Sequence, residues 1–275
     1  MPLRMEQIGK EFKLPPFEYN PQTIELYHLG LGITDLEYVF EKNIQVLPSF
    51  AVVPAFRILL EAVQVAGINP MMVLHGEQRI EIARRPIPWM AKTVTTGRIS
   101  KVYDKGKAAL VIVEADTVDE AGGLLFRNIY SLFARGEGGF GGERGPSKKS
   151  EAPSRAPDQV VEFQTWPFQN LIYRLSGDLN PLHADPAFAK LVGFDRPILH
   201  GLCTFGVVCR AIVSAMCGND PARVLSFEAR LSGEVYPGDR IITEMWLEPD
   251  GRVMAQAKTG DGRLVLSNAA AAISG

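Results

Sequence analysis

Two stretches of the chain have an unbroken apolar pattern that ends at a glycine. Residues 54–66 are apolar on nearly every side and stop at Gly67, and residues 204–217 repeat this pattern and stop at Gly218. A helix that is apolar all round is buried, and glycine is a common residue just after a helix. The pattern therefore predicts one buried helix in each half of the chain.

Downstream of each predicted helix, apolar and polar residues alternate with a period of two. The alternation is interrupted by turn sequences at 104–107, 119–123, 249–252 and 260–263. Strands joined by such turns form hairpins, and consecutive hairpins form an antiparallel sheet. A doubly wound α/β fold would need a helix between successive strands, so it is disfavoured.

The two halves are separated by a stretch of unusual composition. Of the 23 residues 136–158, 12 are Gly, Pro or Ser, so the stretch has little apolar surface to bury. We interpret it as a linker between residues 1–135 and residues 159–275. Each flank is large enough to hold a core of its own.

The flanks are related to each other. Residues 26–32 align with 172–178, residues 46–50 with 198–202, and residues 77–80 with 228–231, in the same order. Arg79 and Arg230 occupy equivalent positions, which favours a structural role over phosphate binding. A single apolar helix and a run of long strands pack best when the sheet wraps the helix. The expected fold is therefore α+β, a double hot-dog with two antiparallel sheets that each wrap a central helix.

Charge and composition restrict the partner. The 29 Lys and Arg residues nearly balance the 31 Asp and Glu residues, which gives a net charge of −2. Such a chain lacks the basic surface of a general nucleic-acid binder. It has no apolar run of about 18 residues and no signal-peptide pattern at its N-terminus. We expect a small-molecule ligand, no membrane partner and a cytoplasmic location; the C-terminal Ile-Ser-Gly also differs from a peroxisomal Ser-Lys-Leu ending.

The densest group of polar residues lies in the second half. Asp178, Asn180 and His183 follow a glycine and flank a proline, so the segment must turn. Gly-Asp and Asn-Pro are also ordinary turn formers, which leaves a structural interpretation open. The first half, however, has Gly32 in place of Asp178 and no matching histidine. A purely structural turn should have survived in both copies, so we interpret the three residues as functional and expect one active site per chain.

A second feature precedes the second predicted helix. Gly201 allows a ligand to approach the backbone, and N–H groups at the start of a helix carry partial positive charge. The two features together offer a base, an acid and a site for a developing anion. We interpret the neighbouring His200 as positional rather than catalytic, because Gly201 alone explains the feature.

Other polar residues have simpler interpretations. Asp185 precedes a proline and is expected to cap a short helix that ends at Gly193. His28 and His75 have no carboxylate at a suitable spacing and are expected to be core or surface residues. The three cysteines at 203, 209 and 217 match no zinc pattern and are expected to be reduced. Lysines 101, 105 and 107 could meet phosphates but are more simply explained as solvated side chains.

Residues 173–183 (Tyr-Arg-Leu-Ser-Gly-Asp-Leu-Asn-Pro-Leu-His), followed by Ile-Leu-His-Gly at 198–201, resemble the signature of the R-specific enoyl-CoA hydratases of the MaoC-like family. The first half is similar to the N-terminal half of double hot-dog members of that family, including the hydratase domain of peroxisomal multifunctional enzymes. The stretches that carry this similarity are 27–32, 46–54, 74–78, 104–107 and 138–142. The resemblance covers essentially the whole chain.

The resemblance implies specific roles. Asp178 and His183 would hold and activate a water, Asn180 would support them, and the Gly201 N–H would bind the thioester oxygen. His200 and Tyr173 would lie at the substrate. Some members have a serine eight residues after the glycine, where this chain has Cys209, which affects only how Asp178 is oriented.

The implied reaction is reversible hydration of trans-2-enoyl-CoA to (3R)-3-hydroxyacyl-CoA, as in fatty-acid or related acyl-CoA metabolism. It needs neither metal nor cofactor, because CoA is part of the substrate. The first half would be non-catalytic and would accommodate the acyl chain, and the enzyme is expected to be a homodimer. Two alternatives stay open, an acyl-CoA thioesterase and a non-catalytic acyl-CoA-binding partner subunit. The acyl group, and which of Asp178 and His183 is the formal base, are also open.

Overall fold

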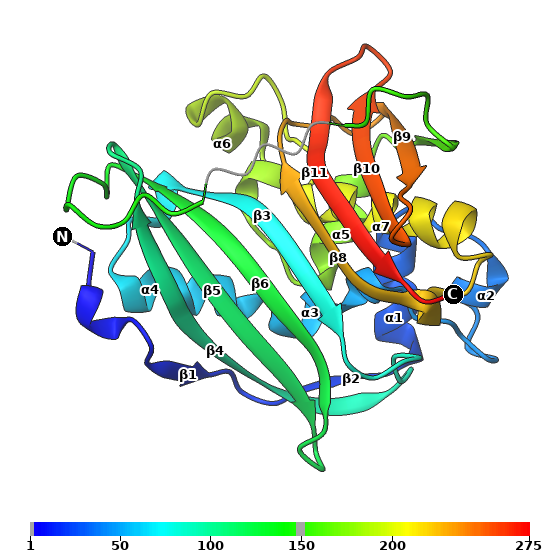
Figure 1. The fold of residues 1–275 in the computed structure, drawn as a ribbon, viewed down its shortest axis with the longest axis horizontal. Helices are drawn as coiled ribbons and strands as arrows, with labels where there is room; N and C mark the ends of the chain where they lie inside the picture. The colour runs from blue at the N-terminus through cyan, green and yellow to red at the C-terminus, as the bar shows by residue number, and fades with distance from the viewer. Residues whose placement is uncertain (1–2, 147–151) are drawn as a thin grey trace.

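A computed structural model describes residues 3–146 and 152–275 of the chain, and its strands form one continuous antiparallel sheet (Figure 1). Along the sheet the strands follow the order β1-β4-β5-β6-β3-β8-β11-β10-β9-β7, and β2 pairs with the N-terminal end of β4. The strands are β1 (Glu11–Lys13), β2 (Phe17–Tyr19), β3 (Val73–Ile82), β4 (Ala91–Asp104), β5 (Ala108–Asp119), β6 (Leu124–Arg135), β7 (Gln159–Gln164), β8 (Val224–Leu231), β9 (Arg240–Leu247), β10 (Arg252–Thr259) and β11 (Leu264–Ile273).

Helices line one face of this sheet (Figure 1). In the first half they are η1 (Met5–Gln7), α1 (Pro21–Gly30), α2 (Leu36–Val39), η2 (Pro48–Ala51), α3 (Val52–Ala55), α4 (Arg57–Ala66) and η3 (Pro70–Met72). In the second half they are α5 (Gln169–Tyr173), η4 (Arg174–Ser176), η5 (Pro181–His183), α6 (Pro186–Leu191), α7 (Gly201–Met216) and η6 (Pro221–Arg223).

All four predicted hairpin turns are confirmed, since each falls between two paired neighbouring strands. α4 packs against β4 and β5, whereas α7 contacts every strand of the second half. Each helix therefore lies in the curve of its own set of strands. The expected α+β double hot-dog is confirmed, but the expectation of two separate sheets is wrong, because β3 and β8 pair and join them into one.

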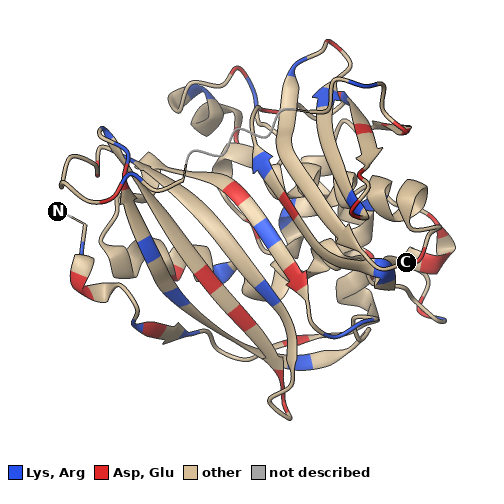
Figure 2. Cartoon of the chain, viewed as in Figure 1, with Lys and Arg blue, Asp and Glu red and all other residues tan. Residues whose placement is uncertain are grey.

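The two halves meet at β3 and β8, which pair so that Gln78 lies opposite Ala229. As a consequence, equivalent residues of the two halves form reciprocal ion pairs across this seam. Arg230 contacts Glu77 at 2.7 Å, and Arg79 contacts Glu228 at 2.8 Å. Figure 2 shows that acidic and basic positions recur along the strands of the sheet. The structural role predicted for Arg79 and Arg230 is confirmed.

The prediction of one buried helix in the first half is wrong in two respects. First, residues 54–66 do not form a single helix. The segment breaks at Phe56, and the two parts, Pro48–Ala55 and Arg57–Ala66, are bent by 48°. Pro54 lies just before this break and cannot donate a helical hydrogen bond. Second, α4 is buried on one side only, since Leu60 is 60% exposed. Gly67 does end the helix, in the left-handed conformation.

The second predicted helix is confirmed but starts earlier than expected. α7 begins at Gly201 with His200 as its N-cap residue, and it ends at Met216. The pattern of apolar residues misplaced the start at Thr204. A glycine has no side chain to contribute to such a pattern, although it fits the first turn here.

Part of the predicted linker is held in place by one carboxylate. Asp104, at the end of β4, accepts hydrogen bonds from the backbone N–H groups of Gly106, Gly139 and Gly141 at 2.7–2.9 Å. The glycine-rich stretch thus packs on the β4–β5 hairpin without regular secondary structure. Residues 147–151 of the predicted linker lie outside the described residues.

Among the residues that the structure describes, no single helix is long and apolar enough to cross a membrane. The bent pair Pro48–Ala55 and Arg57–Ala66 reaches the required length only together. Both parts contribute residues to the core.

Candidate functional site

The segment 173–183 folds into two short 3₁₀ turns that leave Asp178 between them. η4 ends at Gly177, whose φ of 129° is accessible mainly to glycine. Asn180 then starts η5, and its side chain accepts a hydrogen bond from the Leu182 N–H at 3.0 Å. The backbone N–H of Asn180 donates to the Asp178 carboxylate at 3.1 Å. Asn180 therefore shapes the turn and orients Asp178, and its side-chain oxygen is used within η5.

His183 is buried and held in one orientation. Its Nδ1 lies 2.9 Å from the carbonyl oxygen of Ile198, and since a carbonyl can only accept, Nδ1 carries the proton. The Asn170 side chain donates to the His183 carbonyl at 2.6 Å. The remaining ring nitrogen, Nε2, is 3.9 Å from the Asp178 Oδ2. This distance is too long for a direct hydrogen bond but suits one water that contacts both groups.

Burial dominates the electrostatics of this pair. It raises the pKa of Asp178 above its ordinary value, partly opposed by the nearby His183. It lowers the pKa of His183 below its ordinary value, partly opposed by the Asp178 carboxylate. Both shifts favour the uncharged forms, because a buried site solvates charge poorly. Two groups with shifts of this kind, facing one point in space, are suited to proton transfer near neutral pH.

His200 lies directly against this pair. Its ring stacks on that of His183 with centroids 3.7 Å apart, and its Nε2 donates to the Asp178 carbonyl oxygen at 3.1 Å. Gly201 follows as the first residue of α7, so its N–H has no acceptor within the helix. A Cβ at Gly201 would come within 2.6 Å of the Leu231 side chain. The position therefore accepts only glycine without a shift of Leu231.

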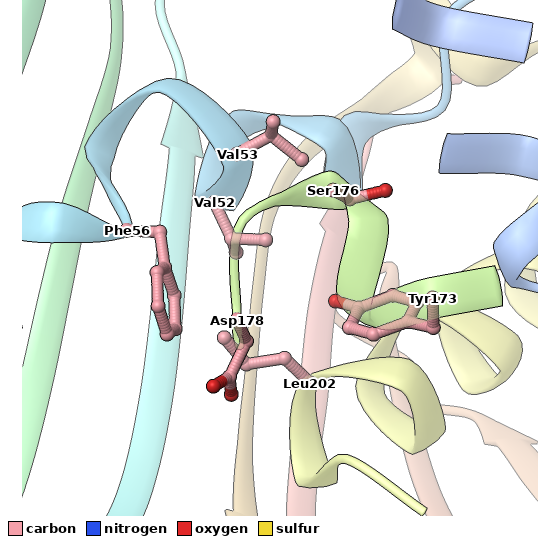
Figure 3. Close-up of a pocket in the computed structure, with 7 residues that line it drawn as sticks. All are labelled: Val52, Val53, Phe56, Tyr173, Ser176, Asp178 and Leu202. Atoms are coloured by element: carbon pink, nitrogen blue, oxygen red, sulfur yellow. The ribbon is translucent and has the colours of Figure 1, made fainter. Parts of the chain in front are cut away.

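A small pocket that is partly open to solvent lies beside Asp178. Figure 3 shows the residues around it, which come from both halves of the chain. Tyr173, Ser176, Asp178 and Leu202 belong to the second half, whereas Val52, Val53 and Phe56 belong to α3 and its break in the first half. The sequence interpretation missed these three apolar residues. Their signal was the alignment of residues 46–50 with 198–202, because Val52 and Val53 directly follow the stretch equivalent to the start of α7.

In the first half, the space beside Gly32, the residue equivalent to Asp178, is filled by another side chain. A side chain at Gly32, which aligns with Asp178, would meet the Phe163 ring at 2.4 Å. Ser49, which aligns with Gly201, is fully buried. The described structure thus leaves no room at Gly32 for a second carboxylate without displacement of Phe163.

Asp178, His183 and His200 each offer a potential metal ligand within 4.8 Å of the others. The geometry does not fit a shared ion. The two histidine rings are stacked at an angle of only 25°, so their in-plane lone pairs cannot both point at one position. His183 Nδ1 and His200 Nε2 are also both engaged by carbonyl oxygens.

The remaining predicted residues fall mainly outside the site. Asp185 caps α6 by accepting from the Ala187 N–H at 2.8 Å, as predicted. His28 is a core residue and His75 is half-buried on β3. The Cys209 thiol lies beside Ser49, whereas the Asp178 carboxylate faces the Asn180 N–H and His183. The three cysteines are buried and unpaired by disulfides.

Comparison with known proteins gives a consistent assignment. Residues 17–136 match the family model of the MFE-2 hydratase 2 N-terminal domain, and residues 148–269 match that of the MaoC like domain. The chain is 43% identical to a probable enoyl-CoA hydratase 2 of Dictyostelium discoideum, over 95% of this chain and 94% of that protein.

Two solved structures are also similar. A MaoC-like dehydratase from Phytophthora capsici is 35% identical, with a TM-score of 0.89 over 99% of both chains. The peroxisomal multifunctional enzyme type 2 of Drosophila melanogaster is 33% identical, with a TM-score of 0.85 over 96% of this chain and 48% of that chain. The chain therefore belongs to the MaoC-like family, in the group that contains enoyl-CoA hydratase 2 and the hydratase part of peroxisomal multifunctional enzyme type 2.

Proposed function

We propose that this protein is an enoyl-CoA hydratase that reversibly adds water to trans-2-enoyl-CoA and forms (3R)-3-hydroxyacyl-CoA. The observation that carries the proposal is the 3.9 Å separation of Asp178 Oδ2 and His183 Nε2 beside the start of α7 and an apolar pocket. This arrangement offers a water site, two proton-transfer groups and a backbone N–H within one small region.

In the proposed hydration, His183 Nε2 accepts a proton from the bound water as the water oxygen forms a bond to C3. This assignment is supported by the Nδ1–H bond to Ile198, which leaves the Nε2 lone pair directed away from that carbonyl. Protonated Asp178 delivers its proton to C2. The proton that His183 took from the water then passes to Asp178, which restores the starting state of both residues. The raised pKa of the buried Asp178 favours this protonated form. Each such group contributes about 10²–10⁴-fold to the rate.

Negative charge develops on the thioester oxygen as C3 is attacked. The N–H of Gly201 is the proposed donor to this oxygen, because the first N–H groups of a helix lack partners and carry partial positive charge. An oxyanion donor typically contributes about 10²–10³-fold to kcat. Tyr173 lines the pocket and is proposed to complete the substrate site, while the fully buried His200 packs behind Tyr173.

Residues 1–135 are proposed to form a non-catalytic repeat that accommodates the acyl chain, and residues 159–275 the catalytic repeat. The blocked position at Gly32 and the contribution of Val52, Val53 and Phe56 to the pocket support this division. The break at Phe56 turns the axis of α4 away from that of α3, which leaves apolar side chains facing the site. The homodimer, the cytoplasmic location and the independence from metals and cofactors stay predictions.

Incubation with crotonyl-CoA tests the proposal. A hydratase removes the enoyl absorbance without releasing free thiol, whereas a thioesterase releases thiol. A binding subunit neither removes the enoyl absorbance nor releases thiol. If neither change occurred with crotonyl-CoA or with longer enoyl-CoA substrates, the proposal would be contradicted. Chiral analysis of the product then determines whether the 3R alcohol forms.

The site assignment predicts that Asp178→Asn and His183→Gln each lower kcat by about 10²-fold or more, because each removes a proton-transfer group. Asp185→Asn is the matched control, since asparagine caps a helix as well as aspartate does and Asp185 lies on α6. Steady-state kinetics of the purified variants provide the measurement. Full activity in both site variants would show that the pair is assigned wrongly.

A further inference from the structure

His200 contacts both proposed proton-transfer residues, although its own side chain faces neither solvent nor a charged partner. It is fully buried, its Nε2 donates to the Asp178 backbone carbonyl, and its ring covers that of His183. Its peptide also leads directly into Gly201 at the start of α7. The His200 side chain therefore contacts the backbone of Asp178 and the ring of His183, and its residue directly precedes the proposed oxyanion donor Gly201.

The hydrogen bonds determine the tautomer of His200. Because a carbonyl accepts at Nε2, the single proton of the neutral ring is on Nε2, and Nδ1 is left as an acceptor. That Nδ1 is buried without a hydrogen-bond partner among the described residues. A residue retained only for stability would not be expected to bury an unpaired acceptor, since this is unfavourable.

We propose that His200 is a positioning residue, which fixes Asp178 through a backbone hydrogen bond and His183 through ring stacking, so that both groups reach the same water. This inference rests on the proposed hydration. It differs from a direct catalytic role, because neither His200 contact involves an atom that exchanges a proton with the substrate.

Two variants separate the two contacts. His200→Phe retains an aromatic ring against His183 but removes the donor to the Asp178 carbonyl. His200→Gln retains an N–H donor but removes the ring. We expect each to lower kcat roughly 10- to 100-fold, since small displacements of reacting groups have effects of that size, while KM changes less than about twofold. His75→Gln, on β3 of the other half, is the matched control and should match the wild type.

The unfolding midpoint distinguishes positioning from a purely structural role. His200→Phe removes the unpaired Nδ1 but also leaves the Asp178 carbonyl without its donor, and because these two effects on stability oppose each other, its midpoint should change little while kcat falls. If both variants kept wild-type kcat, or if KM rose while kcat stayed constant, the positioning role would be wrong; the second result would indicate substrate binding instead.

A measurement on the free enzyme keeps this inference separate from the proposed function. The chain has only four histidines, so ¹⁵N NMR of the imidazole nitrogens can resolve His183. We expect a fixed Nδ1–H tautomer for His183 in the wild type and in His200→Phe, and tautomer averaging in His200→Gln. An unchanged His183 spectrum in His200→Gln would overturn the stacking role even if the wild type proved to lack hydratase activity.

Discussion

His28 and His183 are both buried, and each donates Nδ1–H to a backbone carbonyl. In His28 this carbonyl belongs to Tyr38, at 2.7 Å, and Nε2 accepts from the Leu47 N–H at 3.3 Å. In His183 the Nε2 faces the Asp178 carboxylate instead. Whether a buried histidine can transfer protons is therefore decided by what lies opposite its second nitrogen. The spacing of the residues agrees with this difference, because His183 has an aspartate five residues before it, whereas His28 has a threonine there.

Because His28 is buried and both of its ring nitrogens are hydrogen-bonded, we expect stability to depend on pH. Burial lowers the pKa of His28 from 6.5 to about 4, so between these values the unfolded chain binds a proton that the folded chain excludes. Stability is thus complete above about pH 6.5 and decreases as the pH falls toward 4. The loss from this residue amounts to about 3 kcal/mol. Urea unfolding at pH 7.5 and 4.5 should show a smaller pH effect in His28→Gln than in the wild type. Equal pH effects in the two proteins would contradict this assignment.

At the scale of the elements, the contact between α1 and α5 lies just before the segment that carries Asp178. These helices are related by the repeat, and the rings of Tyr27 and Tyr173 lie 5.9 Å apart. At Gly30 the two backbones approach so closely that a Cβ would lie 2.9 Å from the Cα of Tyr173. The repeat itself could be found from the sequence. The close approach could not, because it depends on how the two helices cross.

Gly30→Ala should therefore destabilise the protein by about 1–3 kcal/mol, as overpacking of a well-packed contact does. It should also lower kcat, because the displaced Tyr173 begins the segment that carries Asp178. Urea unfolding and hydration kinetics test both effects. Gly76→Ala, where φ is not positive and the new Cβ would meet its nearest neighbour at 3.4 Å, controls for the substitution without severe crowding. Unchanged stability in Gly30→Ala would indicate that α1 and α5 can separate freely.

At the scale of the whole molecule, the seam between β3 and β8 joins the two repeats into one sheet. The reciprocal pairs of Glu77 with Arg230 and of Arg79 with Glu228 favour this register. Their side chains are 33–41% exposed, so each pair is expected to contribute at most about 1 kcal/mol. Their main effect is specificity, since a shifted register would place like charges together.

A charge exchange tests this role. Glu77→Arg alone places two arginines opposite each other and should lower the unfolding free energy by about 1 kcal/mol. Adding Arg230→Glu should restore most of the loss. The exposed Lys92 and Glu120 pair, exchanged in the same way, serves as the control. The seam pairs would have no specific role if the double exchange were no more stable than Glu77→Arg alone.

The sequence by itself determined the repeat, the hairpins and the α+β class, and it indicated Asp178, His183 and Gly201 as the candidate site. It could do so because periodicity, turn chemistry and motif spacing are local properties of the chain. It did not reveal the break at Phe56, the reciprocal seam or the stacking of His200 on His183. Nor did it assign Val52, Val53 and Phe56 to the pocket. These features arise from contacts between residues far apart in the chain, so only the tertiary structure decided them.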